Sequence, residues 1–444
     1  MRIIISLIVF FFYSCINANA QEYKFDFGEG SAPKGYIKVT PQSYFDYQTG
    51  YGFDKNSSIK SVMRKLQKPL VNDFITSDKP FFFSVKVPEG NYDVKIIIGD
   101  VEGVSATTIR AECRRLFLQN VRTAKGEIVT KNITIHVRDS LIRDQSGNIS
   151  GKVKLKPREF AYLHWDNMLT LEFNDSSAKI CAVEISANKL APTIFLAGNS
   201  TVVDQDREPW AAWGQMFPVF FEGGSAVIAN YAESGEAMRS FKSAKRLEKI
   251  WSMSKPGDYL FIEFAHNDQK QGGSYLDPFT TYKTTIKEWI SESKKRQMTP
   301  VLVTSMHRRN FDSLGHIINT LSDYPEAMRQ VAKEENVALV DLNAMSKILY
   351  EAWGEELSLK AFVHYLANSF PGQDKPIKDN THFSPYGAYE LAKCVVQSIK
   401  DQQLPLAKYL KKTIPLYNPA KPTDFKTWYW PSSILLSAIK PDGN

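Results

Sequence analysis

Cysteine is scarce in this sequence, with only four in 444 residues. Cys113, Cys181 and Cys394 remain when the first twenty residues are set aside, and an odd, small number argues against a disulfide framework. A Cys113–Cys181 pair and buried free thiols are both compatible with this pattern. No cysteine or histidine has the spacing of a metal ligand, so the sequence predicts neither a metal site nor a cofactor.

Long runs of one charge are also missing. The chain has 55 Lys and Arg against 48 Asp and Glu, and its basic residues are scattered apart from short clusters such as Lys294-Lys295-Arg296. This distribution argues against a nucleic-acid partner. A net charge of +7 is nevertheless compatible with attraction to an acidic polymer.

Residues 1–20 have the pattern of a secretory leader. Arg2 precedes an apolar stretch, and Ala18-Asn19-Ala20 is a small-residue cleavage site. The apolar stretch is too short to cross a bilayer comfortably, so we expect no membrane span. We expect cleavage after Ala20 and export to the periplasm or the medium. An uncleaved anchor and lipid attachment at Cys15 are alternatives, although Phe12-Tyr13-Ser14 is a poor acylation site.

Two patterns divide the remaining chain. From Tyr23 to about Ala187, short alternating runs such as Asn132–Val137 are separated by turn residues, which is typical of a β-sandwich or jelly roll. From Thr193 onward, short apolar strands alternate with helical stretches, which predicts an α/β fold with a parallel sheet. The expected strands are 193–197, 226–229, 259–264, 300–304 and 337–341, and the expected helices are 237–251, 280–296, 323–335 and 386–401.

The predicted boundaries are a leader at 1–20, a β domain at 21–190, an α/β domain at 191–404 and an extension at 405–444. The extension is rich in Pro, Trp and Tyr, and we expect it to pack on the fold. Trp428 and Trp430 are interpreted as packing residues, with a sugar platform as the alternative. We expect the β domain to fold separately and to be unnecessary for the chemistry.

Four short blocks carry polar residues at predicted strand or helix boundaries. They are Gly198-Asn199-Ser200, Asn230–Gly235, Phe264–Asp268 and Asp379-Asn380-Thr381-His382. Serine becomes a good nucleophile only when a base takes its proton, and the base needs a third group to orient it. Ser200, His382 and Asp379 are the candidates for these three roles.

Ester cleavage also passes through an oxyanion, which needs hydrogen-bond donors. The candidates are the backbone N–H groups of Ser200 and Gly235 and the side-chain amide of Asn267. Each block alone has an ordinary reading: a turn at Ser200, a turn at Asn267-Asp268, or a helix cap at Asp379. Four blocks in this order favour the catalytic reading.

The blocks resemble those of the SGNH (GDSL-like) hydrolases over about 193–402. Within that group they are most similar to rhamnogalacturonan acetylesterases, whose third block reads G-H-N-D and whose last reads D-x-T-H-F. This chain has Ala265-His266-Asn267-Asp268 and Asp379–Phe383, and Ser305–Phe311 resembles a further stretch of that branch. Ala265 stands in place of the usual glycine, and the sequence leaves the effect of that change open.

The amino-terminal part is similar to the galactose-binding-like β domain of such esterases, through Phe25–Gly28 and Gly50–Phe53. The resemblance implies a flavodoxin-like three-layer SGNH domain behind a jelly-roll domain. It also implies a secreted esterase that removes acetyl groups from pectin, with rhamnogalacturonan as the first choice of substrate.

The resemblance further suggests that His266, Arg308 and Arg309 contact the substrate. A solvated or loop-bracing role for the two arginines, and a structural role for His266, stay open. Alternative functions are an esterase for another acetylated glycan or a lipid ester, or a carbohydrate-binding protein with a vestigial esterase domain. The sequence leaves open the acetylated sugar, its hydroxyl, the role of the β domain and the oligomeric state.

Overall fold

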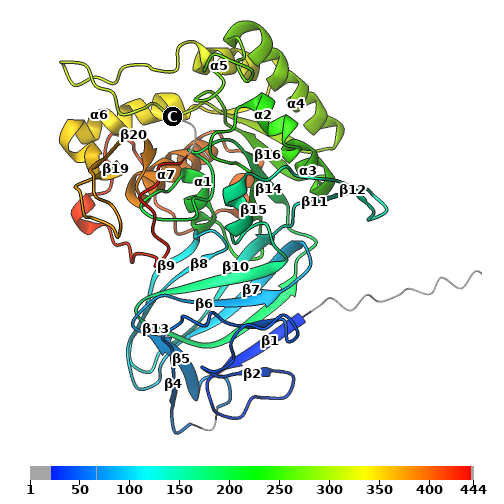
Figure 1. Ribbon diagram of the computed structural model, residues 1–444, viewed down its shortest axis with the longest axis vertical. Coiled ribbons are helices and arrows are strands. Elements are labelled where there is room, and N and C mark those ends of the chain that lie inside the picture. Colours follow the sequence, from blue (N-terminus) through cyan, green and yellow to red (C-terminus); the bar gives the residue numbers. More distant parts are fainter. Residues whose placement is uncertain (1–21, 67, 442–444) are drawn as a thin grey trace, which may run out of the picture.

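The computed structural model describes residues 22–66 and 68–441 (Figure 1). The predicted leader lies outside the described residues. The first part of the chain contains strands β1 Glu22–Phe27, β2 Ile37–Val39, β3 Tyr51–Phe53, β4 Lys60–Met63, β5 Asp73–Ser77, β6 Phe81–Lys86, β7 Gly90–Gly99, β8 Ser105–Ala111, β9 Arg115–Thr123, β10 Ile128–Val137, β11 Leu141–Arg143, β12 Ile149–Lys152 and β13 Met168–Ala187. The short turn η1 Pro157–Ala161 interrupts them.

The sandwich is organised around β13, which belongs to both of its sheets. The first half of β13 pairs with β6 and β8, and its second half pairs with β7 and β1. The register shifts between Asn174 and Ser177 and again between Ile180 and Ala182, so the strand turns from one sheet into the other. Alternate residues of the strands point inward and form one aromatic-rich core that includes Phe25, Phe83 and Phe173.

The second part of the chain contains strands β14 Thr193–Ala197, β15 Val227–Asn230, β16 Tyr259–Ile262, β17 Thr299–Val303, β18 Ala338–Val340, β19 Phe362–Tyr365 and β20 Ile377–Phe383. Its helices are α1 Trp213–Met216, α2 Met238–Ser243, α3 Arg246–Met253, α4 Lys283–Lys295, α5 Tyr324–Glu334, α6 Leu342–Ala361 and α7 Pro385–Asp401. Short helical turns are η2 Phe217–Phe220, η3 Pro278–Tyr282, η4 Pro405–Tyr409 and η5 Phe425–Thr427.

The parallel sheet has the order β15-β14-β16-β17-β18. Successive residues of β14 face opposite sides, so Ile194 and Leu196 join one hydrophobic core and Phe195 and Ala197 join the other. Helices α1, α6 and α7 cover the first face, and α2 to α5 cover the second (Figure 1). This is the predicted three-layer α/β fold, and its strand order is the flavodoxin-like one.

The two parts of the chain share hydrophobic cores. Leu116 of β9 packs into the core that holds α1 and α7, and Ile142, Val153 and Trp165 pack into the core that holds α2 to α5. A protein that starts at residue 191 would therefore expose both cores, which is a physical reason to expect aggregation rather than independent folding.

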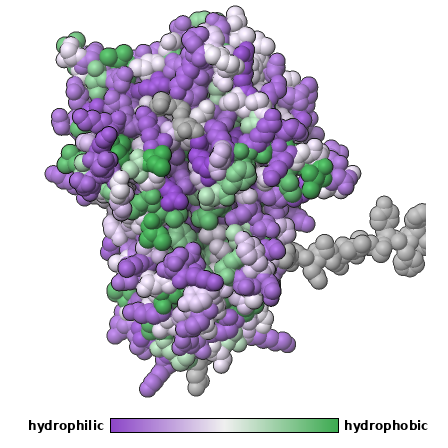
Figure 2. Space-filling view, viewed as in Figure 1, coloured by the Kyte–Doolittle hydropathy of each residue, from purple (hydrophilic) through white to green (hydrophobic). Residues whose placement is uncertain are grey.

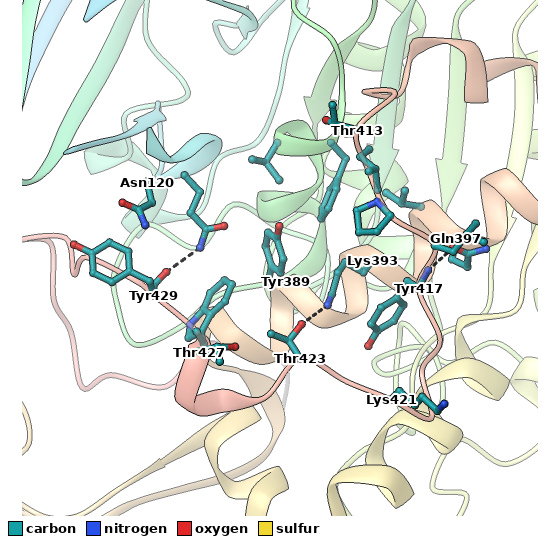
Figure 3. A pocket seen from close by; sticks show the side chains of 18 residues that line it. Asn120, Tyr389, Lys393, Gln397, Thr413, Tyr417, Lys421, Thr423, Thr427 and Tyr429 are labelled. Carbon is teal, nitrogen blue, oxygen red and sulfur yellow. Dashed lines mark hydrogen bonds between the residues drawn. The ribbon is translucent and has the colours of Figure 1, made fainter. Parts of the chain in front are cut away.

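The C-terminal extension lies against both parts. Tyr417 bonds Glu390 of α7 at 2.8 Å, and Gln119 of β9 donates to Tyr429 O at 2.8 Å. A hollow of about 720 Å³ lies between the extension, α7 and β9 (Figure 3). The ring of Trp430 stacks on Trp428. The Arg110 guanidinium lies over the same ring, 4.1 Å from its centre, so Trp430 is a packing residue.

Cys113, Cys181 and Cys394 are free and buried, so Cys113 and Cys181 do not pair. Across the described part of the chain, no helix combines the length and the apolar character that crossing a membrane requires.

Trp165 is the clearest test of the shared core. Its ring nitrogen donates to Glu159 at 2.9 Å, and the Arg138 guanidinium lies 4.3 Å from its ring centre. We expect Trp165→Ala to lower the free energy of unfolding of the whole protein by about 3–5 kcal/mol. Denaturant unfolding followed by circular dichroism measures this loss.

Phe160→Ala is the matched control, because Phe160 lies on the same segment with 70% of its surface exposed. It should change the free energy of unfolding by less than about 0.5 kcal/mol. Equal effects of the two substitutions would contradict the shared core.

Candidate active site

Three of the four blocks meet where the strand order reverses. β14 lies between β15 and β16, and the chain leaves it toward β15 before crossing to β16. Ser200 follows β14, Gly235 follows β15 and Asn267 follows β16, all at the carboxyl edge of the sheet. Ligands bind at this position in open α/β sheets, because the loops of adjacent strands diverge there.

The loop that carries Ser200 is held by its own side chains. Asn199 Oδ1 accepts bonds from the N–H and the hydroxyl of Thr201, at 3.1 and 2.9 Å. A Cβ at Gly198 would lie 2.5 Å from Val202, so only glycine fits before this turn. Ser200 itself is 2% exposed.

His382 and Asp379 form a buried hydrogen-bonded pair. His382 Nδ1 lies 2.9 Å from Asp379 Oδ2, and Asp379 Oδ1 accepts the N–H groups of Thr381 and His382 at 2.7 and 2.9 Å. Burial alone would raise the pKa of Asp379, but the bond and charge of His382 and the two N–H groups outweigh it, so the pKa lies well below its usual range. The carboxylate is therefore ionised.

Asp379 does not cap the following helix, which was the ordinary reading of its block. That role belongs to Ser384, whose hydroxyl accepts the N–H of Gly387 at the start of α7. Asp379 and His382 lie on β20 instead, and this strand pairs with β19.

His382 Nε2 has no hydrogen-bond partner among the described residues, and no bond joins it to the Ser200 hydroxyl. The two are linked through the segment 201–213. Gln205 donates to Ser200 O at 3.0 Å, and Ala211 N donates to Phe383 O at 2.9 Å. Catalytic hydrogen bonds often form fully only with substrate, so a free Nε2 is compatible with a base that awaits its proton donor.

Gly235 and Asn267 line one hollow of about 360 Å³. Gly235 has a φ of +82°, a conformation that favours glycine and presents its backbone without a side chain. One hydrogen of the Asn267 amide bonds Glu236 O at 3.0 Å. The second hydrogen of that NH₂ group remains available for a ligand.

Glu263 is a buried residue of this site that the sequence analysis missed. Its carboxylate accepts bonds from Thr201 and Trp213 at 2.9 and 2.6 Å and from Ser305 at 3.2 Å, so it joins the loops after β14 and β17. Burial raises its pKa to about 7, although these three bonds lower it. A lone Glu at the end of an apolar strand gave no signal of this role.

The three predicted substrate-contact residues differ in their surroundings. His266 is buried, neither of its ring nitrogens has a hydrogen-bond partner in the described part of the chain, and burial holds its pKa well below the usual value. Arg308 donates to Thr320 Oγ1 at 3.1 Å. Arg309 donates to Ser358 of α6 at 2.9 Å, which agrees with the loop-bracing alternative. Substrate contact stays a prediction for all three.

A second group of polar side chains lies beneath the Gly235 loop. Glu159, His164 and Glu233 offer possible metal-ligand atoms within 4.8 Å of one another. The guanidinium of Arg246 binds Glu159, and that of Arg158 binds Glu233. These cations already neutralise the two carboxylates, so the donor set does not fit an additional divalent cation.

Two family patterns match the chain. Residues 23–139 match the galactose-binding-like domain of the beta-agarase/YXIM esterase-like group, and residues 196–388 match the GDSL-like lipase/acylhydrolase family. Rhamnogalacturonan acetylesterase RhgT of Bacillus subtilis is 42% identical over 219 residues, which are 49% of this chain and 93% of that protein.

The uncharacterized esterase YxiM of the same bacterium is 25% identical over 87% of this chain and 92% of its own. An X-ray structure of the YxiM protein covers 87% of this chain and 99% of that one, with 24% identity and a TM-score of 0.44. This chain belongs to the GDSL-like lipase/acylhydrolase family and is a carboxylic ester hydrolase.

Buried carboxyl groups at the site predict a pH-dependent stability. Burial raises the pKa of Glu263 and of Asp268 to about 7 each. A folded-state pKa above the unfolded value means that the folded protein holds the proton more tightly, so stability falls as the pH rises from the unfolded pKa to the folded one. We expect the melting temperature to fall between about pH 4.5 and about pH 7.

Glu263→Gln should reduce this pH-dependent fall in melting temperature, because glutamine cannot ionise. Glu248→Gln, at an exposed position of α3, is the matched control and should keep the wild-type slope. Thermal unfolding across this pH range measures both. A Glu263→Gln variant with the wild-type slope would show that Glu263 does not contribute.

Proposed function

We propose that the protein is an acetylesterase that uses Ser200, His382 and Asp379 to cleave acetyl esters of rhamnogalacturonan. The observation that carries this proposal is the buried His382–Asp379 pair, whose Nε2 has no hydrogen-bond partner among the described residues. A histidine oriented by a carboxylate is the group that serine needs as its base.

In the proposed reaction, Ser200 Oγ attacks the acetyl carbonyl while His382 Nε2 takes the hydroxyl proton. Asp379 holds the imidazolium that forms. The tetrahedral intermediate collapses, the C–O bond to the sugar breaks, and His382 gives its proton to the sugar oxygen. Water then attacks the acetyl-serine with His382 as base, which releases acetate and restores Ser200.

The negative oxygen of each intermediate would bind the N–H groups of Ser200 and Gly235 and the free hydrogen of the Asn267 amide. Ser200 is buried, and Gly235 and Asn267 line the hollow of about 360 Å³. Donors fixed in this way stabilise the transition state without reorganising during the reaction.

The choice of substrate is supported by the likeness to RhgT, a protein named as a rhamnogalacturonan acetylesterase. Most of the surface shown in Figure 2 is hydrophilic, with hydrophobic groups gathered across its middle. Export of the protein is part of the proposal and rests on the pattern of residues 1–20 alone.

Ser200→Ala should abolish acetate release from acetylated rhamnogalacturonan, with turnover reduced on the order of 10⁴-fold or more. The reason is that no other group would form the acetyl-enzyme. Ser146→Ala, on an exposed turn, is the control and should keep full activity. Near-normal acetate release by a folded Ser200→Ala protein would refute the nucleophile.

Asn267→Ala should lower kcat by roughly 10²–10³-fold, because one oxyanion donor is lost. Asn267→Asp has nearly the same shape but places a negative charge beside the oxyanion, so its kcat should be lower still. Steady-state kinetics on a small acetate ester distinguish the two. A rise in KM alone would make Asn267 a ground-state binding residue.

A further inference from the structure

The last described residues of the chain return to the active site. We call residues 431–441 the C-terminal strap. Its backbone pairs with Glu208, through Glu208 N to Leu435 O at 2.9 Å and Ser437 N to Glu208 O at 2.8 Å.

Glu208 also fastens the strap through its side chain. Its carboxylate accepts the ring N–H of Trp430 and the backbone N–H of Ser433, each at 2.9 Å. The buried Arg114 of the β8–β9 turn lies 3.3 Å from the same oxygen. The strap is therefore held by the sandwich and by the loop after Ser200 at once.

The strap brings a lysine to the proposed catalytic pair. Lys440 Nζ lies 3.4 Å from Asp379 Oδ2, the oxygen that also faces His382 Nδ1. Trp210 secures this end of the strap, because its ring N–H donates to Ser437 O at 3.0 Å. The Trp210 ring also meets the His382 ring edge-on, with centroids 5.7 Å apart.

The contact of Lys440 with Asp379 is weak. Asp379 already accepts three shorter hydrogen bonds from Thr381 and His382, and 3.4 Å is long for an ammonium–carboxylate bond. The Lys440 side chain is 47% exposed, and ion pairs at such exposure contribute little. The ammonium can therefore exchange Asp379 for another carboxylate at small cost.

Two further cations, Lys270 and Arg308, lie near Lys440. Lys270 lines the hollow with Gly235 and Asn267. Its pKa is lowered by burial and by the charges of Arg308 and Lys440, while Asp379 favours the charged form of Arg308. Lys440 lies beside Asp379, and its charge and that of Arg308 lower the pKa of Lys270, so an anionic group on the substrate would relieve the repulsion among these cations.

We propose that the strap is part of the substrate site and that Lys440 determines specificity by binding a uronate carboxylate of the acetylated polysaccharide. This inference rests on the proposed function. When Lys440 moves to the substrate, Asp379 Oδ2 faces His382 alone, and the imidazolium no longer shares that oxygen with an ammonium. An acidic substrate would thereby bind better and leave the catalytic pair intact.

The test compares acetylated rhamnogalacturonan oligosaccharides with free uronate carboxylates and the same oligosaccharides after methyl esterification. Acetate release gives kcat/KM for each form. We expect the wild type to prefer the free acid by about tenfold, as one charge-assisted hydrogen bond allows. Lys440→Met should reduce this ratio at least threefold, and Lys440→Arg should keep most of it.

Lys421→Met is the matched control, because Lys421 lies on the same extension at the hollow of Figure 3 and should leave the ratio unchanged. High salt should lower the ratio of the wild type more than that of Lys440→Met. An unchanged ratio in Lys440→Met would overturn the proposal. So would an equal loss on both forms, because a merely structural lysine lowers both.

Failure of the proposed function is a different result. In that case the wild type releases no acetate from either form of rhamnogalacturonan but cleaves a small acetate ester. The same comparison is then made on acetylated homogalacturonan, with free and with esterified carboxylates. Loss of an acid preference in Lys440→Met supports the role of Lys440 there, and an absent or unaffected preference overturns it.

Discussion

Two buried arginines, one in the β8–β9 turn and one at the start of β9, join the two parts of the molecule. Arg114 and Arg115 are at most 1% exposed, and a guanidinium at this depth needs acceptors around it. Arg114 donates to Gln205 O and Trp210 O, each at 3.1 Å, and Arg115 reaches Ile228 O at 3.1 Å and Asp204 at 3.3 Å. The sandwich supplies the charges and one acceptor, His136 O at 2.8 Å from Arg115, and the α/β part supplies the acceptors named above, so the sandwich does not satisfy both guanidinium groups alone.

This dependence extends into the proposed site. The carbonyls that Arg114 holds belong to the segment 201–213, which runs from the Ser200 loop to β20. Glu208 in the same segment joins Arg114, Trp430 and the strap. The β part is therefore more than an attached module. It braces the segment that links the nucleophile loop to the strand carrying Asp379 and His382.

Sequence patterns predicted the helices and strands well where apolar residues recur at a regular spacing. All five parallel strands and the helices at 283–295, 324–334 and 385–401 lie within a few residues of their expected positions. Helix α6 was missed, because Gly354, at a φ of +65°, breaks its periodicity and its residues alternate between buried and exposed without a clear stripe. The single helix expected at 237–251 is two helices, separated by Lys245 in a left-handed conformation.

The sequence by itself determined the fold class and the identities of Ser200, Gly235, Asn267, Asp379 and His382 as candidates, because strand ends and chemical residue types are local properties. Only the tertiary structure decided what surrounds them. Glu263, Glu208 and Lys440 carry no motif, and their roles come from partners far away in the sequence, such as Asp379 for Lys440 and Arg114 for Glu208. Burial and close approach between distant segments create these roles, and no local pattern encodes either one.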